Sequence, residues 1–278
     1  MRIRAHNAKQ GTSAMYARPT APLPIGGVVD DAIKLYRETF ARCWPIALVG
    51  ALIMGMFGIF LTIYVRNAGL GLTGFALLQV YREPPIWALY LLQSVLSLAF
   101  YGALIASQNA VAIGDAPLSF GEALAIGFTR LGRAVVAGIV WWAVIVIGMV
   151  LLLVPGFYFL GALCLWPVAL FADDAGAMQS LQISRDLVKG HWWRSSTILT
   201  IAVIIILVFT MVIGVVAGVL AAILHRDIAT AQLVIQCVSI VANVFVLPMI
   251  PAVLLVMYRD LKLRREGGDL AARVGALP

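Results

Sequence analysis

Charge is missing from six long apolar stretches of this chain, and this constrains the fold more than any other feature. These stretches are residues 45–64, 86–110, 134–154, 157–172, 197–224 and 233–257. A helix of about 20 apolar residues is long enough to cross a bilayer. The chain is 62% hydrophobic and 12% charged, which is about half the charge of a soluble domain. The runs are continuous rather than alternating, so the sequence predicts an all-α polytopic membrane protein with six transmembrane helices.

Lysine and arginine are distributed unevenly around these spans. Of the 20 Lys and Arg residues, only Arg66, Arg82 and Arg226 fall on the side opposite the termini. Basic residues accumulate on the cytoplasmic side of membrane proteins. We therefore expect both termini to be cytoplasmic. The expected parts are a mobile tail at 1–27, a six-helix transmembrane domain at 28–258 and a cytoplasmic C-terminal tail at 259–278.

Three segments that precede apolar spans show an amphipathic pattern. Residues 29–44 place Val29, Ile33, Tyr36 and Phe40 on one helical face, with charged residues on the other. Such a helix is suited to lie in the membrane interface. We expect all three helices to lie at the cytoplasmic face, roughly parallel to the membrane.

The second and third segments begin with capping signals. Ser119 and Glu122 have the spacing of a capping box. The helix after them repeats large apolar residues on one face, namely Phe120, Leu124, Phe128 and Leu131. The acidic pair Asp173-Asp174 precedes the third helix, at 176–189, and Asp174 is its predicted N-cap.

Short blocks at residues 32–35, 123–126 and 180–183 align with one another. Each block belongs to a cytoplasm-side helix that leads into a pair of spans. This order supports a three-fold internal repeat. The alternative is that the three helices resemble one another only through their amphipathic patterning.

Glycine and proline predict several turns. Pro155 and Gly156 indicate a turn between the third and fourth spans, with Gly156 able to take a positive φ. Gly190 follows an apparent helix end and is predicted to have a positive φ as its C′ residue. Pro248 and Pro251 predict a kink in the last span.

Residues that usually carry catalysis or bind metals are scattered. Cys43, Cys164 and Cys237 lie in separate segments, and no Cys or His residues have the spacing of a metal site. The uncharged spans argue against a proton- or sodium-coupled transporter. Basic residues flank the spans instead of forming an aromatic-rich patch, so nucleic acid is not an expected partner. We expect no catalytic residue, no metal and no cofactor.

Gln93, Gln236 and Asn243 lie within the predicted spans and form a candidate polar patch. Hydrogen bonding between helices is their simpler role. One expected function is a non-enzymatic scaffold or modulator of an envelope or lipid-related process. Its partners would be membrane lipids, and a membrane or envelope protein or a second copy of the chain. The alternative is a permease or channel for a lipidic or small neutral substrate that uses the polar patch.

Residues 154–193 (VPGFYFLGALCLWPVALFADDAGAMQSLQISRDLVKGHWW) resemble a pattern of poorly characterised bacterial six-span membrane proteins. This family includes the membrane domain attached to some glycerophosphoryl diester phosphodiesterases. In it, a Pro-Gly pair opens one span, and a helix with Ser, Leu or Val, Gly and Trp precedes the next. The corresponding residues here are Pro155, Gly156, Ser184, Leu187 or Val188, Gly190 and Trp193, with Trp192 beside them.

The opening residues 22–40 resemble the entry helix of the same family. The resemblance implies a six-span helical fold in the bacterial inner (cytoplasmic) membrane and a structural role for the matching residues. The catalytic domain of the phosphodiesterases has no counterpart in this sequence. Their activity is therefore not expected here.

Overall fold

The computed structural model describes residues 16–17, 19–68, 80, 83–224 and 228–275, and every regular element among them is a helix. The helices are α1 (Ile25–Asn67), α3 (Pro84–Ile113), α4 (Phe120–Thr129), α5 (Leu131–Ala162), α6 (Trp166–Ala172), α7 (Ala177–Val188), α8 (Trp192–Leu224), α9 (Ile228–Val246) and α10 (Met249–Gly275). Five helical stretches are long and apolar enough to cross a membrane. The predicted all-α class is confirmed, and these stretches are compatible with a multi-pass membrane protein.

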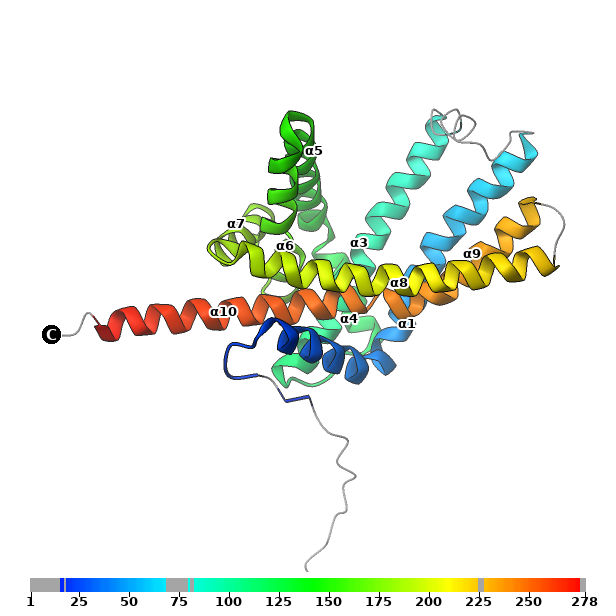
Figure 1. Ribbon diagram of the computed structural model, residues 1–278. Coiled ribbons are helices and arrows are strands. Elements are labelled where there is room, and N and C mark those ends of the chain that lie inside the picture. The colour runs from blue at the N-terminus through cyan, green and yellow to red at the C-terminus, as the bar shows by residue number, and fades with distance from the viewer. Residues whose placement is uncertain (1–15, 18, 69–79, 81–82, 225–227, 276–278) are drawn as a thin grey trace, which may run out of the picture.

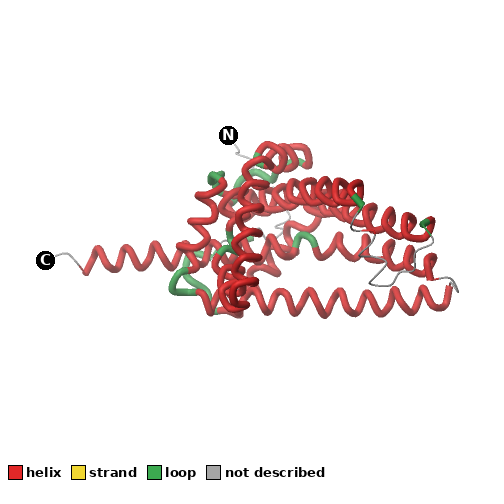
Figure 2. Tube along the Cα trace, turned by 90° about the horizontal axis from the view of Figure 1, so that it is seen from above, coloured by secondary structure: helices red, strands yellow, loops and turns green. Residues whose placement is uncertain are grey.

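The long helices form three hairpins that rise from a common base (Figure 1). The α5 hairpin stands apart from the other two, which are joined because α9 packs along α1. The second half of α1 pairs with α3, the two arms of α5 pair with each other, and α8 pairs with α9. The base consists of α4, α6, α7, residues 25–44 of α1 and residues 249–264 of α10. Seen from above, the C-terminal part of α10 extends beyond the other helices (Figure 2).

The largest cluster of buried apolar side chains among the described residues is centred on the base. This cluster joins Val28 and Leu35 of α1 to Phe171 of α6 and to Leu255 and Tyr258 of α10. The hairpins bury less, since only 11% of the most apolar stretch of α8 is buried inside the protein. Lipid tolerates exposed apolar surface of this kind, whereas water penalises it.

The first part of α1 is amphipathic, but its buried face is not the predicted one. Its buried residues are Val28, Asp31, Ala32, Leu35, Thr39 and Cys43. Ile33, which belongs to the predicted apolar face, is 39% exposed. Asp31 and Thr39 are buried because each has a hydrogen-bond partner: Tyr16 Oη donates to Asp31, and Thr39 Oγ1 donates to Leu35 O. Counting apolar residues alone could not reveal these bonds.

Two helix starts differ in how well they were predicted. The capping box of α4 is confirmed, because Ser119 Oγ accepts from Glu122 N–H and the Glu122 carboxylate accepts from Ser119 N–H. The predicted N-cap of α7 is wrong. α7 follows Gly176, whose N–H donates to Gln179 Oε1 at 3.2 Å. Asp174 instead has a positive φ of 57°.

The α5 hairpin turns at Leu152, which is non-helical (φ −164°, ψ 103°). The turn thus begins before Pro155. The two arms meet at Gly148 and Gly156, where a Cβ on Gly148 would lie 2.9 Å from Gly156 N. Gly156 is not one of the described residues with positive φ. Its missing side chain therefore allows the two arms to approach closely, and no left-handed backbone is involved. Gly190 does have a positive φ, of 83°, as predicted.

Two predicted spans are divided by helix breaks. α5 ends at Ala162 and α6 begins at Trp166, inside the fourth predicted span. α9 ends at Val246 and α10 begins at Met249, so the predicted kink near Pro248 is a break. Gln108 Nε2 donates to Pro248 O at 2.7 Å and satisfies a carbonyl there.

Candidate functional site

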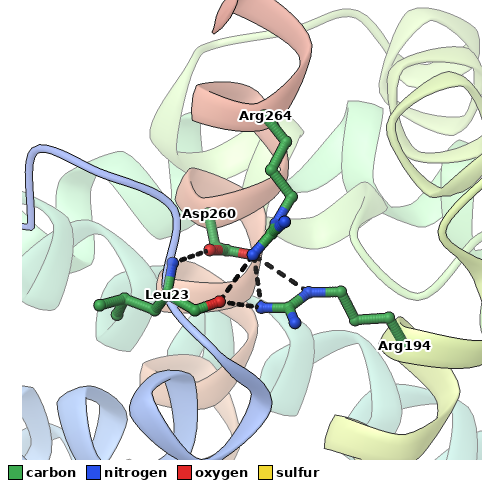
Figure 3. Close-up of polar contacts among 4 residues, drawn as sticks. All are labelled: Leu23, Arg194, Asp260 and Arg264. Carbon is green, nitrogen blue, oxygen red and sulfur yellow. Dashed lines mark hydrogen bonds and ion pairs between the residues drawn. The ribbon is translucent and has the colours of Figure 1, made fainter. Parts of the chain in front are cut away.

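A buried ionic cluster joins three segments that are far apart in the sequence: the residues before α1, the start of α8 and α10 (Figure 3). Asp260 of α10 lies at its centre, with a side chain only 2% exposed. Its carboxylate accepts hydrogen bonds from Leu23 N–H at 2.8 Å, from Arg194 Nη2 at 2.9 Å and from Arg264 Nε at 3.0 Å. Both arginines also donate to Leu23 O at 2.6 Å. We refer to these four residues as the Asp260 cluster.

The Asp260 cluster contains two guanidinium groups and one carboxylate. Buried charges are tolerated when they are paired and hydrogen-bonded. Here both carboxylate oxygens accept bonds, and the Leu23 carbonyl oxygen accepts from the two arginines. The cluster therefore fastens the segment before α1 to α8 and α10, and this arrangement suits a structural role better than a reacting one.

Asp173 forms a second connection within the base. Its carboxylate accepts a hydrogen bond from Tyr258 Oη at 2.7 Å and pairs with Lys262. Lys262 Nζ also lies 5.0 Å from the centroid of the Tyr258 ring, a cation–π geometry. These contacts hold the end of α6 against α10.

Asp174 connects the start of α5 to the loop before α7. Its carboxylate pairs with Arg133 Nη2 at 2.6 Å and with Arg130 Nε at 3.1 Å. The hydrogen bond from Arg133, and then the positive charge of Arg130, lower the pKa of Asp174 below its ordinary value. The side chain is 58% exposed, so this pair contributes less than a buried one.

α10 supplies most of these polar contacts. Arg259 Nη2 adds another by donating to Asn109 Oδ1 of α3 at 2.7 Å. These residues do not stand out in the sequence as site residues, because they follow the last apolar span and resemble an ordinary charged tail. One signal was present: Asp260 and Arg264 have the i, i+4 spacing of a helical ion pair, which indicates that the helix continues past residue 258.

The three residues of the predicted polar patch lie on α3 and α9. Gln236 of α9 faces α1, where a Cβ on Gly58 would lie 2.6 Å from its Nε2. Asn243 Nδ2 donates to Ser239 O in its own helix at 2.9 Å. Gln93 lies on α3. Within the described part of the chain, no hydrogen bond joins these three side chains.

Ser184 of the family-like motif holds a helix break together. Its Oγ donates to Ala162 O at 3.0 Å and accepts from Leu165 N–H at 3.0 Å. These two backbone groups flank the break between α5 and α6. Ser184 therefore attaches α7 to the second arm of the α5 hairpin.

Trp192 attaches the start of α8 to the same arm. Its Nε1 donates to Tyr158 O at 3.0 Å, and its ring stacks on that of Tyr158 with centroids 5.8 Å apart. Gly161 leaves space for it, since a Cβ there would lie 2.9 Å from Trp192 Nε1. Trp193 is 80% exposed, as expected for a residue at a membrane interface.

Two apolar grooves lie on the sides of the helices. The first, of about 280 Å³, lies between α1 and α3 and includes Ser94 and Ser97 in its lining. Ser97 Oγ and Gln93 Oε1 are buried without a hydrogen-bond partner. The second, of about 350 Å³, lies between the first part of α1, α8 and α10 and is lined by apolar side chains and Arg37.

Among the residues that the structure describes, no group of three or more His, Cys, Asp or Glu side chains is placed to hold a metal ion. Comparison with protein-family models, curated proteins and solved structures finds no match for this chain. Function must therefore be inferred from the residues and geometry of the chain itself.

Proposed function

We propose that this protein is a non-enzymatic integral membrane scaffold that organises lipid around its exposed apolar hairpins and so modulates a lipid-related process of the cell envelope. The observation that carries this proposal is the contrast between a densely bonded base and hairpins that bury little of themselves (Figure 1). At the tip of α5, Val150, Leu151 and Leu152 are each at least 70% exposed. Lipid chains are the surroundings that suit such side chains.

The proposal extends to location and topology. The protein would lie in the bacterial inner membrane, cross it six times and keep both termini in the cytoplasm. The two arms of α5 would count as two crossings. Each hairpin follows one shorter helical segment: the first part of α1, then α4, then α7. This order supports a three-fold repeat of one interfacial helix and one hairpin.

Cysteine labelling tests the topology. With Cys43, Cys164 and Cys237 replaced by Ser, Glu83→Cys and Gln182→Cys each provide one exposed thiol. A membrane-impermeant maleimide should label the position-83 variant in intact spheroplasts, and the position-182 variant only after permeabilisation. Labelling of the position-182 variant in intact spheroplasts would contradict the proposed sidedness.

Isolation with native lipid tests the function. The tagged protein would be crosslinked in cells and extracted in a lipid-retaining polymer, beside an unrelated multi-pass protein of the same membrane as the control. We expect enrichment of one lipid class over the surrounding membrane, or one crosslinked envelope protein. Lipid at bulk composition together with no crosslinked partner would contradict the scaffold.

A permease or channel for a lipidic or small neutral substrate is the second candidate. The groove between α1 and α3 favours it, because its mostly apolar lining includes Ser97, whose Oγ has no hydrogen-bond partner among the described residues. Reconstituted vesicles separate the two functions. A permease would accelerate glycerol-driven swelling or the movement of labelled phospholipid between leaflets, and Ser97→Ala would slow it. A scaffold would leave both rates equal to those of empty vesicles.

A further inference from the structure

The groove between α1, α8 and α10 has an apolar surface, and Arg37 is the one charged residue among those described that borders it. Its apolar lining includes Ile33 of α1, Ala202 and Ile205 of α8 and Val253 of α10. Tyr36 also lines the groove, but its hydroxyl already donates to Phe245 O at 2.9 Å. Arg37 is thus the charged group at this groove.

In the part of the chain that the structure describes, Arg37 has no ion-pair or hydrogen-bond partner, unlike four other arginines of the protein. The guanidinium groups of Arg130, Arg133, Arg194 and Arg264 all pair with carboxylates. Within the described residues, Arg37 makes no ion pair and no hydrogen bond, even with its neighbour Glu38. An exposed guanidinium beside an apolar groove therefore remains free to bind an anion.

We propose that this groove binds an anionic phospholipid, with an acyl chain along its apolar walls and the headgroup phosphate on Arg37. This inference rests on the proposed lipid scaffold and names one of its lipid sites. The planar guanidinium matches phosphate oxygens in a bidentate geometry. The first part of α1, which carries Arg37, is also the segment suited to the depth where headgroups meet acyl chains. Ile33 and Ile205, at 39% and 37% exposure, leave the groove open at the side.

Lipid retention by the full-length protein tests this site. The purified protein would be stripped of lipid in mild detergent and then offered dioleoyl-phosphatidylglycerol or dioleoyl-phosphatidylcholine, with bound lipid counted by native mass spectrometry. We expect wild type to prefer phosphatidylglycerol. Arg37→Gln should reduce that preference about five-fold, the effect expected of one basic residue near anionic lipid. Ile205→Trp should reduce retention of both lipids by filling the groove.

Arg185→Gln is the matched control, because Arg185 is an exposed, unpaired basic residue of α7 away from this groove. Equal losses in the Arg37 and Arg185 variants would show that only general surface charge attracts the lipid, and would overturn the proposal. Unchanged retention in Ile205→Trp would do the same. The scaffold is tested separately, by the lipid that copurifies with the wild-type protein from cells. A loss of the groove site therefore leaves that result unchanged, and the two failures are distinguishable.

A second measurement does not depend on the folding of any variant. Wild-type protein in phosphatidylglycerol nanodiscs would be crosslinked to a phosphatidylglycerol that carries a photoreactive group on its acyl chain. We expect adducts concentrated on residues 29–37 and 202–205. Adducts spread evenly along the exposed faces of α5 and α8 would overturn the proposal.

Discussion

Leu23 and Asp260 lie 237 positions apart in the chain, yet Leu23 N–H donates to Asp260 Oδ1 at 2.8 Å (Figure 3). Arg194 and Arg264 close the same cluster by bonding both the carboxylate and the Leu23 carbonyl. The segment before the first helix is thereby attached to the last helix and to the start of α8. The base is held together by this attachment as well as by apolar packing.

Asp260→Ala should strongly destabilise the protein, by about 3–5 kcal/mol, because it leaves two largely buried guanidinium groups without a counter-charge. The thermal unfolding midpoint in detergent, followed by fluorescence-detected chromatography, would measure the loss. Asp174→Ala is the control, since it removes a carboxylate that is 58% exposed and should lower the midpoint less. Equal midpoints for the two variants would contradict the role of the Asp260 cluster.

Gly190→Val should lower the folded yield more than His191→Ala does. Gly190 has a φ of 83°, and a side chain in this left-handed region costs about 1–2 kcal/mol. A Cβ at Gly190 would meet no atom within 4 Å, so the loss would come from the backbone alone. Similar monodisperse yields for the two variants would show that the positive φ is not required.

Gly148→Leu should disrupt the α5 hairpin, because a side chain at Gly148 would collide with the backbone of Gly156. Gly214→Leu in α8 is the matched control, since a Cβ there would meet nothing within 4 Å. Limited proteolysis should cleave the first variant more rapidly than the second. A hairpin that tolerates both substitutions equally would contradict the close contact of its arms.

The parts of the fold that depend on local chemistry were predictable from sequence. The long apolar helices follow from continuous uncharged runs. The α4 cap follows from the spacing of Ser119 and Glu122, and the end of α7 follows from Gly190, because each depends on neighbouring residues only. These features require no knowledge of which helices meet.

The remaining features depend on residues far apart in the chain. The buried Asp31 carboxylate accepts a hydrogen bond from Tyr16. The buried Asp260 carboxylate accepts hydrogen bonds from Leu23 N–H and from arginine side chains. Gly156 lies against the opposite arm of the α5 hairpin, where a side chain would not fit. Asp174 pairs with arginines at the start of α5. The groove next to Arg37 involves three helices. Local patterns carry no information on such partners. From sequence, Asp31 therefore resembles part of a polar helix face, Gly156 a turn residue and Asp174 a helix cap. Asp260 and Arg37 resemble solvated charges.

A distance measurement in lipid tests the central claim, that the base holds the α5 hairpin apart from the α8–α9 hairpin so that lipid fills the space between them. Spin labels at Leu153, near the tip of α5, and at Ile223, near the far end of α8, would occupy positions that are 66% and 75% exposed. Packed helices have axes about 8–10 Å apart. Pulsed electron paramagnetic resonance in nanodiscs should give a separation well above that range. A distance typical of packed neighbouring helices would contradict the account.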